Sequence, residues 1–281
     1  MINSLKVLLQ FPYNKKYPLK AISRFLEWKL IRLFKIKNYK KQIWSDKYIY
    51  LSFDSLQSMW LMYHYIVDWE EFNLIENYLK NNMVFFDVGS NMGFYTLWAS
   101  RFLNISGSIH SFEPDENNFN RLYENLKINN IQKFVTINQV AISDINGILQ
   151  FSIGLDGENH ILSNANDAFT KVDSLSLDFY CKSNNVNCID YLKVDVEGFE
   201  LMVIKGAKNL IEQKRIKIIQ LEINKTLGNS NTSSEELINT LEEFGYILCK
   251  YDVEKKQLKP IRYSINRENY FFVFDINILA F

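Results

Sequence analysis

The sequence predicts an α/β fold with a mostly parallel, doubly wound sheet and helices on both of its faces. First, from Met83 onward, short apolar runs typical of strands alternate with segments of helical spacing. Second, the first apolar run ends in Asp87 and is followed by a loop with two glycines. This pattern is typical of a parallel strand whose carboxyl end contacts a ligand. Third, a composition of 47% apolar and 23% charged residues in 281 is ordinary for a globular chain.

The main domain is expected to span residues 66–281, with its elements in a regular order. The parallel strands are predicted at 83–88, 108–113, 134–140, 189–194 and 216–223. The helices of this domain are predicted at 68–81, 92–103, 114–129, 174–183, 199–212 and 234–244. A hairpin arm is expected at 147–153, followed by a long polar loop at 154–168. Two strands, 246–251 and 270–274, are expected to pair antiparallel at the sheet edge.

Residues 1–65 are expected to form a basic, aromatic N-terminal extension. Up to Ile43 the chain has eleven Lys and Arg and one acid, a net charge of +10, so the remainder of this neutral chain carries −10. A helix is predicted from Ala21 to Lys37, where Ile22, Leu26, Leu30, Leu33 and Phe34 recur at helical spacing and form its expected apolar face. This helix either lies on an anionic membrane surface or docks on its own domain with its lysines in water. Nucleic acid is not expected as a partner, because the acidic remainder repels phosphates.

Other sequence features bear on location and partners. The three cysteines lack metal-ligand spacing, which fits a reducing compartment. No secretory signal and no run of the ~18 to 20 apolar residues that span a bilayer is found. We therefore expect a cytoplasmic protein, with peripheral attachment to the inner membrane surface as an open alternative. The aromatic residues of 44–65 can stack on sugar rings, pack in the core or form a homo-oligomer interface.

The loop after the first strand predicts a binding site for a small cofactor. Asp87 is followed by Gly89, Asn91 and Gly93, whose spacing differs from the GxGxxG dinucleotide fingerprint. A pyrophosphate is therefore less favoured than a ligand held through its carboxylate and amine, such as the methionine part of S-adenosylmethionine. A nicotinamide-dependent reductase remains the alternative from another enzyme class.

The ends of the second and third strands extend this prediction to a nucleoside. Glu113 follows Gly93 at about the twenty-residue interval expected of an acid that accepts hydrogen bonds from ribose hydroxyls. Ala141 and Ile142 are small and apolar, as expected of residues that line an adenine slot. Ser143 or Asp144 can receive the adenine amine, although Asp144 can equally be a turn residue before Asn146 and Gly147.

Carboxylates gather at the ends of the fourth and fifth strands. Asp195, Glu197 and Glu200 follow the fourth strand, and Glu222 closes the fifth. Asp195 and Glu222 can hold a divalent metal such as magnesium, or one of them can act as a general base. The alternative is that Lys193 and Lys205 pair with these acids structurally. His160, in the long loop, is a second candidate base, or else a solvated loop residue.

Several motifs occur in an order that resembles one known family. FDVGSNMGFYTL, FEPDENNFNRLYENLKINN, AISDING, KVDVEGFE and IIQLEIN follow one another between about Tyr63 and Asn224. This stretch resembles the FkbM family of S-adenosylmethionine-dependent methyltransferases. The resemblance implies a class I methyltransferase (Rossmann-like) fold with a seven-stranded sheet. It also implies O-methylation, often of a sugar hydroxyl on a glycan or glycosylated metabolite.

The resemblance also assigns roles to residues. The family's first motif falls on Asp87, Gly89, Asn91 and Gly93, its ribose acid on Glu113, and its strand-four motif on Asp195, Glu197 and Gly198. Ser90 stands where Ala is common and, being small, is expected to permit cofactor binding. The acceptor is expected to be a small molecule or a glycan. A degenerate methyltransferase fold that acts as a scaffold is the non-enzyme alternative.

Overall fold

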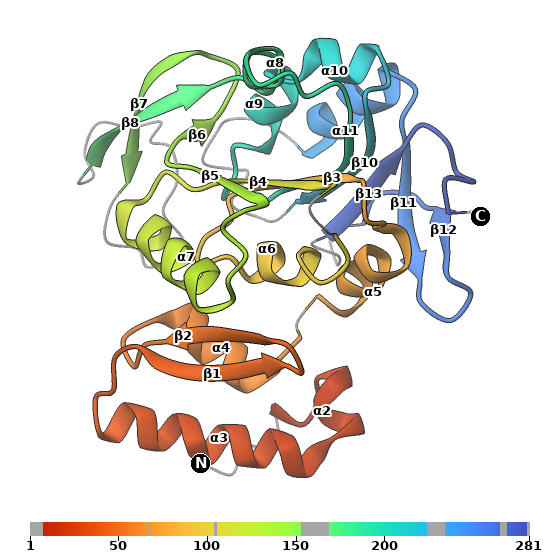
Figure 1. The fold of residues 1–281 in the computed structure, drawn as a ribbon. Coiled ribbons are helices and arrows are strands. Elements are labelled where there is room, and N and C mark those ends of the chain that lie inside the picture. The colour runs from red at the N-terminus through yellow and green to blue at the C-terminus, as the bar shows by residue number, and fades with distance from the viewer. Residues whose placement is uncertain are drawn as a thin grey trace.

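The fold is built in layers that stack on a central sheet (Figure 1). The computed structural model describes residues 8–66, 68–103, 106–152, 169–223, 234–264 and 269–279. Helices cover both faces of the sheet, as predicted, and an N-terminal layer lies beyond the helices of one face. The predicted long loop at 154–168, with His160 in it, and the polar stretch before the last helix fall outside the described residues, apart from Ser234.

The central sheet has eight strands in the order β12-β11-β13-β10-β9-β3-β4-β5. Five of them run parallel: β3 (Val84–Val88), β4 (Ser108–Phe112), β5 (Val135–Asn138), β9 (Ile189–Val194) and β10 (Ile216–Glu222). The predicted antiparallel edge pair is confirmed as β11 (Ile247–Asp252) and β13 (Asn269–Val273). The eighth strand, β12 (Gln257–Pro260), was not predicted and pairs with β11 at the outer edge.

The register of the central strands places several polar residues side by side near the carboxyl ends of the strands. All six residues of β9 are buried, as expected of a parallel strand covered on both faces. Asp87 of β3 pairs with Lys193 of β9 on one side and with Ser111 of β4 on the other. A buried carboxylate therefore lies next to a buried amine near the carboxyl ends of the strands.

The helices divide between the two faces of the sheet (Figure 1). One face carries α5 (Trp69–Tyr78), α6 (Phe94–Ala99) and α7 (Glu116–Ile128), and the other carries α8 (Leu177–Ser183), α9 (Glu200–Lys205), α10 (Lys208–Glu212) and α11 (Ser234–Glu243). The single helix predicted at 199–212 is two helices, with Gly206 and Ala207 between them. A Cβ at Gly206 would lie 2.0 Å from the Ser143 carbonyl oxygen, so this close approach requires glycine.

A second, three-stranded sheet contains β6 (Ala141–Ile142), β7 (Gly147–Ser152) and β8 (Phe169–Leu175). The predicted hairpin arm is β7, which pairs antiparallel with β8. The predicted helix start at 174 is wrong, because Ser174 and Leu175 belong to β8. The helix begins at Leu177, where the side chain of Ser176 accepts a hydrogen bond from the Phe179 amide.

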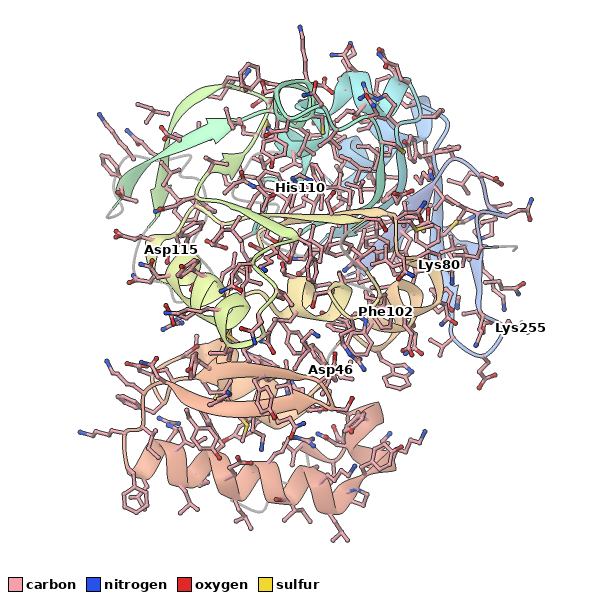
Figure 2. All side chains as sticks on the ribbon, viewed as in Figure 1. Asp46, Lys80, Phe102, His110, Asp115 and Lys255 are labelled. Atoms are coloured by element: carbon pink, nitrogen blue, oxygen red, sulfur yellow. The ribbon has the colours of Figure 1, made fainter. Side chains whose placement is uncertain are left out.

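The N-terminal layer contains α2 (Pro12–Lys16), α3 (Pro18–Leu33), the hairpin β1 (Tyr39–Trp44) and β2 (Lys47–Leu51), and α4 (Leu56–His64). The hairpin was not predicted. Asn125 of α7 and Asn129 at its C-terminus accept hydrogen bonds from the amides of Tyr50 and Tyr48, at 2.7 and 2.8 Å. Asp46, labelled in Figure 2, lies at the hairpin turn. It accepts a hydrogen bond from Arg101, just beyond α6. The layer is thus joined to the helices that support the sheet.

Helix α3 packs through a different stripe from the one predicted to be its apolar face. Its buried apolar residues are Ala21, Phe25, Trp28 and Ile31. Leu26, Leu30 and Leu33, which belong to the predicted stripe, are instead 56%, 55% and 71% exposed. The helix therefore carries two apolar stripes, of which one contacts the protein.

In the part of the chain that the structure describes, no helix is both long and apolar enough to cross a membrane.

Candidate active site

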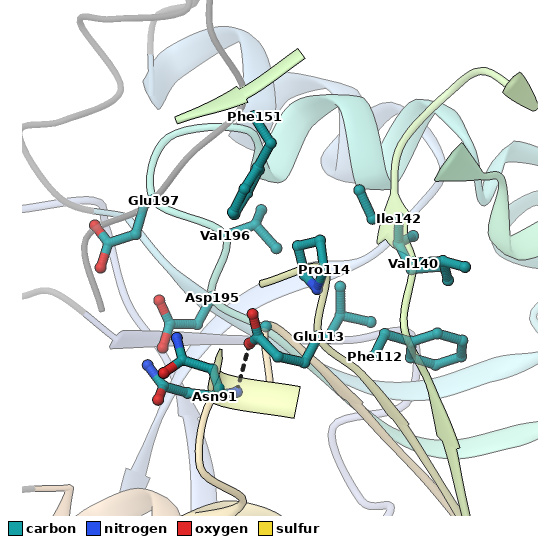
Figure 3. A pocket seen from close by; sticks show the side chains of 14 residues that line it. Asn91, Phe112, Glu113, Pro114, Val140, Ile142, Phe151, Asp195, Val196 and Glu197 are labelled. Carbon is teal, nitrogen blue, oxygen red and sulfur yellow. Dashed lines mark hydrogen bonds between the residues drawn. The ribbon is translucent and has the colours of Figure 1, made fainter. Parts of the chain in front are cut away.

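A pocket opens at the carboxyl ends of β3, β4 and β9 (Figure 3). It encloses about 620 Å³, part of it open to solvent. One wall is apolar and contains Val140, Ile142, Phe151 and Val196, whereas Asn91, Asp195 and Glu197 form the opposite, polar side. Glu113 lies between the two walls. The pocket can therefore accept a ligand with an aromatic end and a polar end.

The glycine loop lies against the end of β9. Gly89 has φ +74°, and a Cβ there would lie 1.8 Å from the carbonyl oxygen of Asp195. The amides of Gly89 and Ser90 both donate to the Phe112 carbonyl, at 3.1 and 3.0 Å. The Ser90 side chain is buried and donates to the same carbonyl. Gly93, with φ +87°, begins α6 and does not line the pocket.

Glu113 clamps the loop from the end of β4. Its carboxylate accepts hydrogen bonds from the Asn91 amide at 2.7 Å and from the Asp115 amide at 2.9 Å. Burial raises the pKa of Glu113 to about 7, although the two amide hydrogen bonds oppose this effect. Each carboxylate oxygen has lone pairs beyond the one used by an amide, so the group can still accept ribose hydroxyls.

Asp87 lies beneath the pocket and does not line it. Its side chain is fully buried, where it accepts a hydrogen bond from Thr96 at 2.7 Å. The Lys193 ammonium lies 3.5 Å from its other oxygen and donates to the Gly89 carbonyl at 2.9 Å. Burial raises the pKa of Asp87, and the Lys193 charge lowers it in turn. Asp87 therefore supports the loop through Lys193.

Asp195 and Glu222 form a pair of interacting carboxyl groups. Asp195 lines the pocket, and Lys193 lies 3.1 Å from one of its oxygens. The negative charge of Asp195 is the main cause that raises the pKa of Glu222 to about 10, with burial second and a hydrogen bond between the two carboxyls third. Glu222 thus holds a proton at neutral pH, and the pair shares one negative charge.

The loop after Asp195 is held in an uncommon conformation. Glu197 has φ +52° and lines the pocket. Glu200 holds this loop by accepting hydrogen bonds from the amides of Val196 and Gly198, at 3.1 and 3.2 Å. Burial raises the pKa of Glu200 to about 7. This acid, at the start of α9, fixes the loop that carries two pocket carboxylates.

A divalent metal fits these residues poorly. A metal on Asp195 would have to share its carboxylate with the Lys193 ammonium, which is already 3.1 Å away. Among the described residues, no group of three or more His, Cys, Asp or Glu side chains is arranged to hold a metal.

The structure separates the predicted site residues into three groups. Gly89, Asn91, Glu113, Ala141, Ile142 and Asp195 line the pocket. Asp87, Ser90 and Gly93 lie behind it and shape the loop, and Glu222 adjoins Asp195. Of the two lysines weighed as structural partners, Lys193 pairs with Asp87 and Asp195, whereas Lys205 pairs with Glu236 at 3.2 Å. His160 lies outside the described residues.

Asn118, Phe151 and Val196 are among the lining residues that the sequence analysis did not assign to the site. Asn118 lies on α7, one turn beyond the Asp115 cap, where a polar residue reads as an ordinary helix surface. Phe151 reaches the apolar wall because β7 folds back along β8, and Val196 does so from the loop after β9. Their proximity depends on contacts between segments far apart in the chain, which leave no local signal.

The strand order and the pocket define the class of the protein. A parallel core that ends in an antiparallel pair, with a glycine loop and an acid at the first two strand ends, is a class I methyltransferase. The chain belongs to the FkbM methyltransferase family, since residues 87–248 match the family model described as Methyltransferase FkbM domain. It is therefore an S-adenosylmethionine-dependent, methyl-transferring enzyme. This membership favours methyl transfer over the reductase and scaffold alternatives.

Similar proteins are found among both curated and solved chains. The hexuronic acid methyltransferase AglP of Haloferax volcanii is 23% identical over 233 residues, which cover 80% of this chain and 95% of that protein. A methyltransferase FkbM from Methylobacillus flagellatus KT has a TM-score of 0.42 at 13% identity, over 69% of this chain and 43% of the other. The METTL16 methyltransferase domain has a TM-score of 0.45 at 17% identity, over 81% and 73% of the two chains.

Proposed function

We propose that this enzyme methylates a hydroxyl oxygen of a sugar, within a glycan or a glycosylated metabolite. The observation that carries the proposal is that one pocket presents both Glu113, suited to a ribose, and Asp195, suited to a hydroxyl proton. The curated relative acts, by its name, on a hexuronic acid, which supports a sugar as the acceptor.

The pocket fits S-adenosylmethionine along its length. Glu113 would accept hydrogen bonds from the ribose hydroxyls, and Ile142, Ala141 and Phe151 would line the adenine end. Gly89 and Asn91 also line the pocket and would hold the methionine end. Asp195 lies on the polar side of the pocket, where it can meet the acceptor hydroxyl.

Asp195 acts as the general base. S-Adenosylmethionine supplies a methyl group on a positively charged sulfur, which keeps the electrons of the broken carbon–sulfur bond when the acceptor oxygen attacks. Asp195 accepts the hydroxyl proton of the acceptor as the new carbon–oxygen bond forms. Lys193 holds the carboxylate in place at 3.1 Å, and protonated Glu222 hydrogen-bonds to it. The remaining catalysis is orientation of the two substrates.

The charges of the pocket favour an uncharged acceptor group. Asp195 and Glu197 both line the pocket, and the Lys193 charge is already shared between Asp87 and Asp195. An acceptor carboxylate would meet like charges here, whereas a hydroxyl would find hydrogen-bond acceptors. We therefore expect transfer to a hydroxyl rather than to a carboxylate, with Asp195 as the proton acceptor.

The test is Asp195→Asn, which keeps the shape of the side chain and removes the base. With labelled S-adenosylmethionine and sugar-containing extracts, we expect the rate of methyl transfer to fall by on the order of 10² to 10⁴. The affinity for S-adenosylhomocysteine, measured by calorimetry, should change by less than about threefold, because Glu113 and the loop are intact.

Asp173→Asn is the matched control. Asp173 is exposed on β8, so its loss should leave both the rate and the affinity unchanged. Full turnover by Asp195→Asn would rule out this residue as the base. If only compounds that contain no sugar became labelled, the proposed substrate class would be wrong.

A further inference from the structure

Helix α3 presents an apolar stripe to the outside of the molecule. It is the outermost layer of the fold, on the side away from the sheet (Figure 1). Leu19, Leu26, Leu30 and Leu33 recur at spacings of seven, four and three residues, so they lie on one face of the helix. They are 80%, 56%, 55% and 71% exposed, and Phe34, just beyond the helix, is 69% exposed. We call these five residues the α3 outer stripe.

The packing of the helix does not require this stripe. Phe25, Trp28 and Ile31 already bury the opposite side, each at 4% exposure or less. Arg24 adds a buried polar anchor, donating to the Met62 carbonyl at 3.2 Å and to Asn14 at 2.5 Å. Exposed leucines scattered singly are common, but a continuous row marks an interaction site.

Basic residues flank the α3 outer stripe. Lys20, Lys29, Arg32 and Lys35 are all exposed on or just after the helix. Glu27, the one acid up to Ile43, is engaged by Tyr39 at 2.7 Å and by Lys41, both on β1. The acid is therefore drawn toward the hairpin, and the side chains beside the stripe are positively charged.

We propose that the α3 outer stripe docks on an anionic lipid surface, with the helix lying in the plane of the interface. The leucines enter the boundary between head groups and acyl chains, and the flanking lysines and arginine reach the anionic head groups. The division of charge orients the molecule, because residues 1–43 carry +10 and the acidic remainder, at −10, is repelled by the same surface.

The charge pattern disfavours the other occupants. In a two-fold pairing of two α3 outer stripes, Lys20, Lys29 and Arg32 of one copy would approach the same residues of the other. Nucleic acid would pair with the basic flanks but leave the exposed leucines without an apolar partner. An anionic bilayer matches both the apolar centre and the basic edges.

The experiment uses the full chain and vesicles of phosphatidylcholine alone or with about 30% phosphatidylserine. In flotation assays we expect the anionic vesicles to bind on the order of tenfold more tightly at low salt. About 0.5 M salt should remove most of this difference, because screening weakens the attraction of the basic flanks. Equal binding to both vesicle types, or no binding to either, would overturn the proposal.

Two triple variants test the two parts of the surface. Leu26→Ser, Leu30→Ser and Leu33→Ser together should reduce binding to anionic vesicles at least tenfold, and a variant that still binds as the parent would contradict the proposal. Lys20→Ser, Lys29→Ser and Arg32→Ser together should remove the preference for anionic lipid. Because all six side chains are exposed, the circular dichroism and methyl-transfer rate of both variants should match the parent.

Matched controls lie elsewhere on the surface. Leu56, Ile145 and Ile148 are 44%, 46% and 64% exposed, and their joint change to Ser should leave vesicle binding intact. Lys250, Lys255 and Lys256 are exposed on or beside β11 and serve as the charge control. The proposal would be overturned in favour of a second copy if sedimentation showed a dimer of the parent that the triple leucine variant does not form and that does not bind vesicles.

Discussion

At the scale of single residues, Lys193 connects the glycine loop after β3 to Asp195, the proposed general base. Its ammonium donates to the Gly89 carbonyl at 2.9 Å and lies between Asp87 and Asp195. Burial alone would lower the pKa of Lys193, but the charges of Asp195 and Asp87 raise it above its usual range. The amine therefore stays charged at any working pH. A displacement of Lys193 would move the loop and the base together.

Glu113 should make cofactor binding depend on pH. Burial raises its pKa to about 7 in the free protein, and only the ionised form offers both oxygens to the ribose hydroxyls. Binding should therefore weaken as pH falls below about 7. We expect S-adenosylhomocysteine to bind about tenfold more weakly at pH 6 than at pH 8, as measured by titration calorimetry.

Glu113→Gln should bind weakly at both pH values, with the pH dependence gone. Glu116→Gln is the control, because Glu116 is exposed in the first turn of α7. Its pH profile should follow that of the parent. A parent protein with the same affinity at pH 6 and pH 8 would show that protonation of Glu113 does not govern binding.

At the scale of elements, the site depends on the contact between the loop after β3 and the end of β9. Gly89 adopts φ +74° and packs against the carbonyl group of Asp195. A Cβ on Gly89 would lie only 1.8 Å from that carbonyl oxygen. Gly89→Ala should push the loop away from β9 and destabilise the protein by at least ~1 to 2 kcal/mol, before any clash is counted. Cofactor affinity should fall by more than about tenfold, measured with denaturation on the same preparations.

Gly147→Ala is the matched control for this change. A Cβ at Gly147 would meet nothing within 4 Å, and its φ lies outside the left-handed region. This substitution should leave affinity unchanged and alter stability by less than about 1 kcal/mol. If Gly89→Ala behaved in the same way as Gly147→Ala, the close packing of the loop on β9 would not support the site.

The sequence reveals those parts of the fold that are local in the chain. The loop from Asp87 to Gly93 and the acid Glu113 belong to one strand–helix–strand unit, whose spacing carries information. The face that α3 buries could not be predicted in the same way. Both of its apolar stripes have helical spacing, and contacts with α4, such as that of Arg24 with Met62, decide which one is covered.

The β1–β2 hairpin shows a second limit. Ile43, Ile49 and Leu51 are buried, but β1 also carries Lys40 and Lys41, which obscure the alternation of a strand. Its strands are fixed by Asn125 and Asn129, more than seventy residues away in the chain. The apolar wall of the pocket is comparable, because Phe151 reaches it only once β7 and β8 have paired.

At the scale of the whole molecule, keeping Glu222 protonated costs the folded protein stability. Glu222 binds a proton in the folded protein up to about pH 10, whereas an unfolded glutamate releases it near pH 4.5. His64 and His110 act in the opposite direction at lower pH, since burial lowers the pKa of each to about 4. The folded protein therefore loses stability through Glu222 as pH rises, while the histidines add stability as pH rises toward 6.5.

The interval from pH 7 to pH 9 should expose the contribution of Glu222. There the folded state holds the Glu222 proton and the unfolded state does not, so the free energy of unfolding falls as pH rises, by about 1 kcal/mol per pH unit. Glu222→Gln cannot titrate and should lose this slope, while Glu235→Gln, exposed on α11, should keep it. Urea denaturation at four pH values gives the slope of each protein. Equal slopes for the parent and Glu222→Gln would mean that Glu222 is ionised in the folded protein, and Asp195 would then lack the protonated partner on which its role as a base depends.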